Sequence, residues 1–124
     1  MNNPEVTMHD TRSTTGFDVH DKAIKAAGVA ISLVIRVPAP LKPIADQVIR
    51  SASSVPANIA EGAGRSGRDR THHYRIAYGS AKEVDTHLRL LVGAGALQVT
   101  RAESTLQLFD DVRAMTWRLM NPPS

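Results

Sequence analysis

Apolar residues recur at alternating steps of three and four in four stretches of this chain, and this repetition limits the fold more than any other feature of the sequence. Such spacing places apolar side chains on one face of an α-helix, and no stretch shows the strict alternation of a half-buried strand. The predicted helices cover about 18–37, 41–61, 67–92 and 101–121. The sequence therefore predicts an all-α protein.

The apolar seams differ in how much of each helix they occupy. In the first helix, further apolar residues leave little polar surface, which predicts a helix that is deeply buried or that faces two partners at once. The seams are Val19, Ala23, Ala26, Ala30, Leu33 and Val37 in the first helix; Leu41, Ile44, Val48, Ala52, Val55 and Ile59 in the second; Tyr74, Ala77, Ala81, Val84, Leu88 and Leu91 in the third; and Thr105, Leu108, Val112, Met115 and Leu119 in the fourth.

Prolines, glycines and capping residues mark the ends of these helices. Three prolines within 38–43 separate the first two helices, and Pro56 predicts a kink in the second because proline removes a backbone donor. Two candidate capping boxes and two glycine pairs mark the other helix ends. They are Ser66 with Asp69, Thr100 with Glu103, Gly62 with Gly64, and Gly93 with Gly95.

Four helices of similar length with short connections are typical of an antiparallel up-down-up-down four-helix bundle. We predict a disordered amino-terminal segment over 1–16, the bundle with its kinked second helix over 17–121, and a tail over 122–124. The amino end lacks the apolar region of a signal peptide, and the longest apolar run, 26–35, is shorter than the about 20 residues that span a membrane. The chain has no cysteine, which suits a reducing cytoplasm. We therefore expect a soluble, cytoplasmic protein with no membrane contact.

A second pattern on the third helix consists of cations. Four of them lie seven residues apart and hence on one face, over roughly 30 Å at about 1.5 Å per residue: Arg68, Arg75, Lys82 and Arg89. Arg65 and Arg70 add charge at its start, and such a row can follow a phosphate backbone. The other interpretation is a solvated face whose charge is partly offset by Asp69 and Asp85. The net charge of +3 permits both, and without interleaved aromatic residues base stacking is not the expected mode.

The candidate chemical groups do not make a complete catalytic site. Glu61 and Glu83 could form a carboxylate pair for acid–base work, or a polar link that fixes the register of two helices. We favour the structural interpretation and predict no enzyme, because no nucleophile, electrophile or metal can be assigned. His72 and His73 are adjacent and point about 100° apart, and the Glu-x-x-His motif of di-iron bundles is absent. No metal or other cofactor is predicted.

Two large apolar residues on the third helix, Ile76 and Leu90, lie outside its seam. Larger exposed apolar patches mark interfaces in soluble proteins. Together with the nearly all-apolar first helix, they predict self-association.

Two motifs resemble a known family. Residues 54–62 read SVPANIAEG and residues 74–83 read YRIAYGSAKE. In order and spacing they are similar to the four-helix-bundle family that includes proteins encoded in intervening sequences of bacterial 23S ribosomal RNA genes and the accessory variability determinants of diversity-generating retroelements. The similarity is strongest over 41–97.

This resemblance implies a homopentameric barrel with no known catalytic activity. For the retroelement members it also implies basic surfaces that bind nucleic acid, DNA or RNA, and association with a reverse transcriptase. By this analogy the candidate nucleic-acid contacts are Arg65, Arg68, Arg70, Arg75, Lys82 and Arg89. The architectural motif residues are Ser54, Pro56, Asn58, Glu61, Gly62, Gly79, Ser80 and Glu83. Among these, Gly79 and Ser80 are expected to let two helices approach closely.

Two functions of different class follow. The first is a non-catalytic homo-oligomer that binds nucleic acid through its basic face, as an accessory factor to a reverse transcriptase. The alternative is a protein-interaction scaffold of the same fold with no nucleic-acid role. The position of the cations separates them, because cations that pair with carboxylates lose their value for phosphate binding.

Overall fold

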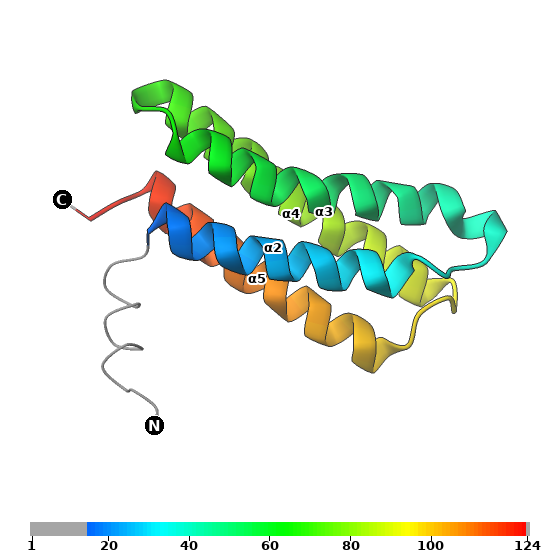
Figure 1. The fold of residues 1–124 in the computed structure, drawn as a ribbon. Coiled ribbons are helices and arrows are strands. Elements are labelled where there is room, and N and C mark those ends of the chain that lie inside the picture. Colours follow the sequence, from blue (N-terminus) through cyan, green and yellow to red (C-terminus); the bar gives the residue numbers. More distant parts are fainter. Residues whose placement is uncertain (1–14, 124) are drawn as a thin grey trace.

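The computed structural model describes residues 15–123 and consists of four α-helices that form one bundle (Figure 1). The helices are α2 (Gly16–Val34), α3 (Lys42–Ala63), α4 (Gly67–Gly93) and α5 (Val99–Met120), with a short 3₁₀ turn, η1 (Ala39–Leu41), before α3. Each helix packs against the next along the chain, and α2 packs against α5, which closes the bundle. The predicted all-α four-helix bundle is confirmed.

The first helix begins earlier than its seam suggested. Thr15 is the N-cap of α2, and its Oγ1 accepts a hydrogen bond from the Asp18 amide at 3.1 Å. The Asp18 carboxylate in turn accepts from the Thr15 amide, so the two residues form a complete capping box. Thr15 and Gly16 thus belong to the helix start, although the prediction placed them in the disordered segment. The rest of that segment, residues 1–14, and Ser124 of the tail lie outside the described residues.

Both predicted capping boxes are wrong. Ser66 is the N-cap of α4, but its side chain makes no capping hydrogen bond, and the Asp69 carboxylate binds Arg65 rather than the Ser66 amide. Helix α5 starts at Val99 with Gln98 as N-cap, so Thr100 lies inside the first turn rather than before it.

Helix α3 continues through Pro56 without a break, and Pro56 itself is buried. The hydroxyl of Ser53 donates to the Ile49 carbonyl at 2.7 Å, one turn earlier. The kink at Pro56 stays a prediction.

The core confirms the seam of α4 completely and corrects that of α5. All six predicted seam residues of α4 are buried. On α5 the core position belongs to Phe109, whereas Leu108 and Met115 are only partly buried. The apolar stripe of this helix is wide, so spacing alone does not choose its inner face; packing places the largest side chain inside. No helix within residues 15–123 is long and apolar enough to cross a membrane.

Candidate nucleic-acid interface

The cation row of α4 faces away from the bundle core, and its members are exposed. The buried face of the helix is the seam from Tyr74 to Leu91, and the row lies on the opposite side of the helical wheel. Whether each cation is available to a phosphate depends on its partners, and these differ along the row.

Arg65, in the turn before α4, is held by two carboxylates. Its guanidinium donates to Glu61 Oε2 at 2.9 Å and to Asp69 Oδ2 at 2.8 Å. The hydrogen bond from Arg65 lowers the pKa of Asp69, and the two carboxylates raise that of Arg65. The positive charge of Arg65 is therefore offset locally, and its side chain ties the end of α3 to the start of α4.

Arg70 has a different structural contact. Its Nε donates to the carbonyls of Gly62 at 3.2 Å and Arg65 at 2.8 Å, and a terminal nitrogen donates to Ala63 at 3.3 Å. These carbonyls lie at or just beyond the carboxyl end of α3, where acceptors lack helical partners and where the helix dipole attracts cations. Arg70 thus caps α3.

At the other end of the row, Arg89 pairs with Asp85 one turn earlier, Nε to Oδ1 at 2.6 Å. The hydrogen bond to Asp85 raises the pKa of Arg89. Its charge is offset in the same way as that of Arg65.

Three of the six predicted cations remain. Within residues 15–123, Arg68, Arg75 and Lys82 make no salt bridge. Lys82 lies over the ring of Tyr78, with Nζ 6.0 Å from the ring centroid, a cation–π contact that leaves the charge uncompensated. At about 1.5 Å per residue these three cations extend over roughly 21 Å.

The polar motif residues form a hydrogen-bonded chain between α3 and α4. Asn58 donates from Nδ2 to the Ser54 carbonyl and hydroxyl, and the Ser80 hydroxyl donates to Ser54 Oγ at 2.9 Å. Asn58 Oδ1 lies 3.0 Å from His73 Nδ1. Because Oδ1 can only accept, His73 carries its proton on Nδ1. Each polar side chain in this set of hydrogen bonds therefore has a partner, and the set fixes the register of α3 against α4.

Sequence reasoning missed two residues that form hydrogen bonds between α3 and α4, His73 and Ser51. The hydroxyl of Ser51 donates to Glu83 Oε1 at 3.3 Å. A spacing signal was present, because Ser51 precedes Asn58 by seven residues and so shares its helix face.

Glu61 and Glu83 are not brought together as an acid–base pair. Glu61 binds Arg65 at the end of α3, whereas Glu83 lies at the level of Ser51, near the middle of α3. In the described part of the chain, no three acidic or histidine side chains gather closely enough to hold a metal ion.

The two motif glycines have opposite surroundings, and neither has the role that was predicted for it. A Cβ on Gly62 would lie 2.5 Å from Tyr74 Cε1 and 2.7 Å from Cδ1, so Gly62 admits the buried tyrosine ring rather than stopping the helix. Gly79 is exposed, and a Cβ there would meet nothing within 4 Å. The prediction that Gly79 lets two helices approach closely is therefore wrong. Only its neighbour Ser80 lies buried against α3.

Helix α2 carries a second apolar seam on its outer face. Phe17, Ile24 and Ile35 are exposed by 78%, 51% and 64%. They share this side with Ile31 and Gly28, so the nearly all-apolar helix has one buried and one exposed face. We call these five residues the outer seam. On α4, Ile76 and Leu90 are also exposed.

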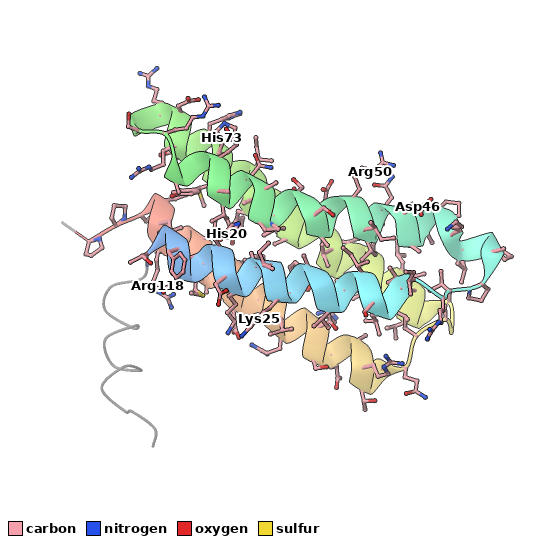
Figure 2. The ribbon with its side chains drawn as sticks, viewed as in Figure 1. His20, Lys25, Asp46, Arg50, His73 and Arg118 are labelled. Atoms are coloured by element: carbon pink, nitrogen blue, oxygen red, sulfur yellow. The ribbon has the colours of Figure 1, made fainter. Side chains whose placement is uncertain are left out.

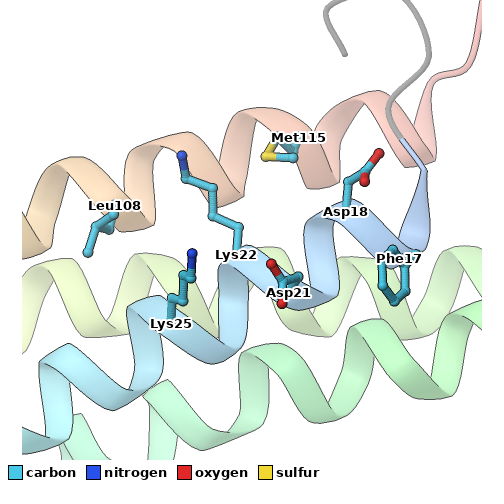
Figure 3. A pocket seen from close by; sticks show the side chains of 7 residues that line it. All are labelled: Phe17, Asp18, Asp21, Lys22, Lys25, Leu108 and Met115. Atoms are coloured by element: carbon cyan, nitrogen blue, oxygen red, sulfur yellow. The ribbon is translucent and has the colours of Figure 1, made fainter. Parts of the chain in front are cut away.

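A cleft of about 510 Å³ separates α2 from α5 near the start of α2 (Figure 3). Phe17, Leu108 and Met115 line it together with four charged side chains of α2. One of these, Lys22, pairs with Asp111 of α5 at 3.3 Å. The opposing charges largely cancel, and no group in the cleft forms a catalytic arrangement.

The chain is similar to known proteins both in sequence and in fold. The sequence profile of the family described as 23S rRNA-intervening sequence protein matches residues 16–118. The chain is also similar to a crystal structure of a protein of unknown function from the S23 ribosomal protein family of Bacteroides thetaiotaomicron. The two share 23% sequence identity with a TM-score of 0.78, over 86% of this chain and 97% of the other. No curated protein matches the sequence.

Proposed function

The chain belongs to the family of 23S rRNA-intervening sequence proteins, and we propose that this four-helix bundle is a non-catalytic, self-associating protein that binds nucleic acid along α4. The observation that carries this proposal is the set of Arg68, Arg75 and Lys82, which have no carboxylate partner within residues 15–123. We call these three residues the free row.

The free row suits a phosphate backbone for electrostatic reasons. Each cation that neutralises a phosphate releases condensed counterions, which supplies most of the non-specific affinity for nucleic acid. Arg65 and Arg89 contribute less, because ion pairs with their own carboxylates must first be broken. Gly79 lies between Arg75 and Lys82 on the same face and leaves open space there. These features support a backbone contact with little sequence preference.

Self-association is supported by the outer seam. A continuous apolar stripe with Phe17 and Ile35 more than half exposed is costly in water, and burial between copies removes that cost. Helices α2 and α4 occupy opposite corners of the bundle, since neither packs extensively against the other (Figure 1). Association through α2 therefore leaves the free row accessible. The resemblance predicts a pentamer.

The binding proposal is tested with labelled single strand, duplex and RNA–DNA hybrid, measured by fluorescence anisotropy. Three phosphate contacts per protomer predict a loss in affinity of about 20- to 40-fold between about 50 and 200 mM salt. Arg75→Ala should leave stability nearly intact, weaken binding to all three ligands and reduce the salt slope by about 1.

Arg50→Ala is the matched control for this experiment. Arg50 is exposed on α3 and points away from the bundle (Figure 2), so it removes the same charge from a different face. Absence of binding at low salt contradicts the nucleic-acid role. Equal effects of Arg50→Ala and Arg75→Ala mean that only the total charge matters.

The association proposal is tested by sedimentation velocity. Ile24→Glu places a charge in the middle of the outer seam and should convert the oligomer to a folded monomer, as checked by circular dichroism. Leu90→Glu makes the same change on the exposed face of α4. If only Leu90→Glu dissociates the protein, the interface lies on α4 and the assignment to α2 fails.

The second candidate function is a protein-interaction scaffold without a nucleic-acid role, and the exposed outer seam favours it. It predicts a stable oligomer whose anisotropy titrations show no nucleic-acid binding. Association with a reverse transcriptase is predicted by the family resemblance alone, and co-purification with a co-expressed enzyme tests it.

A further inference from the structure

We infer that Trp117 of α5 is a base-stacking platform beside the free row, so that the ligand is a single-stranded nucleic acid. This inference rests on the proposed function and names its ligand class. It also revises an expectation from the sequence, in which no aromatic residue lay within the cation pattern of α4.

The register of α4 against α5 places Trp117 next to the free row. A cleft of about 280 Å³ between the two helices is lined by Arg89 and Val92 of α4 and by Glu103 and Leu106 of α5. The helices are antiparallel, and fourteen residues are about four helical turns, which return to nearly the same face of a helix. The residue fourteen positions before a given residue of α4 therefore lies opposite the residue fourteen positions after its neighbour on α5. For Arg89 and Glu103, these residues are Arg75 and Trp117.

The surroundings of Trp117 are positive and aromatic. Tyr78, half-buried one turn after Arg75, lies beneath the ammonium group of Lys82. Two carboxylates border the same groove, but each is paired with an arginine of its own helix, Asp85 with Arg89 and Asp110 with Arg113. Within residues 15–123, Arg75 has no carboxylate partner at the level of Trp117, and Lys82, also without one, lies two turns further along the same face of α4.

The exposure of Trp117 indicates that its ring is available. It is 52% exposed, although tryptophan is usually buried over most of its area. Within residues 15–123 its ring has no aromatic or cation–π partner. A large flat ring without a partner, beside two unpaired cations, matches the chemistry that single-strand binders use: aromatic platforms for bases and cations for the backbone.

This chemistry selects a single strand over a duplex. In a duplex the faces of the bases are already stacked on each other, so Trp117 can reach only the backbone and gains no stacking. In a single strand an unstacked base can lie on the indole while the neighbouring phosphates contact Arg75 and Lys82.

The protein contains one tryptophan, so its intrinsic fluorescence reports Trp117 alone. The experiment titrates the full-length protein with labelled oligothymidylate of about 16 nucleotides, near the upper end of usual site sizes, and with an abasic strand of the same length. Anisotropy of the label measures binding, and tryptophan fluorescence measures stacking. We expect strong quenching with oligothymidylate, little quenching with the abasic strand, and weaker binding of a duplex of equal length at the same salt.

Variants test the same point from the protein side. Trp117→Ala should weaken oligothymidylate binding by about 5- to 100-fold and leave the affinity for the abasic strand unchanged, whereas Trp117→Phe should retain most of the affinity. Val99→Ala, which truncates an exposed apolar residue at the other end of α5, is the control and should leave both affinities unchanged.

The outcomes separate this inference from the proposed function. Salt-sensitive binding with equal quenching by both strands, or with tighter binding of the duplex, overturns the role of Trp117 and leaves the cationic interface intact. Absence of binding to every ligand overturns the proposed function and this inference with it. A fluorescence change that follows protein concentration and not nucleic acid assigns Trp117 to the contact between copies, which also overturns the stacking role.

Discussion

At the scale of single residues, Gly62 and Tyr74 show how one side chain fixes a neighbour. The buried ring of Tyr74 occupies the space that a Cβ at position 62 would need, and the Arg70 carbonyl lies 3.2 Å from the same point. The ring is rigid and enclosed, so it cannot move aside easily. Gly62 is therefore kept inside a helix despite its poor propensity there.

Gly62→Ala should destabilise the protein by about 1–3 kcal/mol, because overpacking outweighs the gain in helix propensity. Gly79→Ala is the matched control on α4. With no atom near its Cβ, it should stabilise the protein by up to about 1 kcal/mol. Thermal and urea unfolding measure both, and a stable Gly62→Ala variant would mean that the ring of Tyr74 moves freely.

The ion pair of Arg65 and Asp69 gives a pH dependence with a definite sign. The pKa of Asp69 is lower in the folded protein, chiefly because Arg65 donates a hydrogen bond to its carboxylate. The contribution is therefore fully present above the ordinary aspartate pKa of about 3.9 and is lost as the pH falls through the lower folded pKa. The carboxyl carbon of Asp69, followed by NMR, should titrate below about 3.9 in the native protein and higher in Arg65→Met. Identical titration curves would contradict the pairing.

At the scale of the elements, the turn from α3 to α4 is stabilised by side chains that the sequence assigned to nucleic acid. Arg70 donates to carbonyls at the end of α3, and Arg65 bridges carboxylates on both helices. The charge at this end of the bundle thus belongs mainly to the architecture. At the start of α4, Arg70 is thus structural, whereas Arg68 belongs to the exposed row that continues along the helix.

Arg70→Ala should lower stability by about 0.5–1.5 kcal/mol, because the carbonyls at the end of α3 lose a cationic donor. Arg68→Ala removes an exposed arginine two residues away and should change stability by less than about 0.5 kcal/mol. The nucleic-acid affinity should respond in the opposite order. Amide hydrogen exchange at residues 60–66 detects the local loosening, and unchanged exchange in Arg70→Ala would exclude the capping role.

At the scale of the whole molecule, the bundle separates two surfaces by its topology. The outer seam lies on α2 and the free row on α4, and these helices occupy opposite corners. The core between them is continuous, with Leu88 and Phe109 among its fully buried side chains. Association and ligand binding can therefore operate on one rigid body without sharing residues.

Leu88→Ala tests this core from its centre. The side chain is fully buried, so truncation should cost about 2–5 kcal/mol. Leu90→Ala, which is half exposed on the same helix, should cost less than about 0.5 kcal/mol in the monomer. Both are compared by urea unfolding at one protein concentration, because association changes apparent stability. Similar costs for the two variants would show that α4 is rotated from the orientation described.

The fold and the seam of α4 follow from the sequence because helical periodicity and proline or glycine boundaries are local properties of the chain. The pairing of Arg89 with Asp85 was also readable, since residues four apart share a helix face. Other features depend on atoms far apart in the sequence. The inner face of α5, the capping role of Arg70 and the reason for Gly62 are set by what packs opposite each residue. The approach of Trp117 to the free row is likewise set by the register between two helices. Spacing within one helix carries no information about that register, so only the tertiary structure decides which predicted cations remain free and what lies beside them.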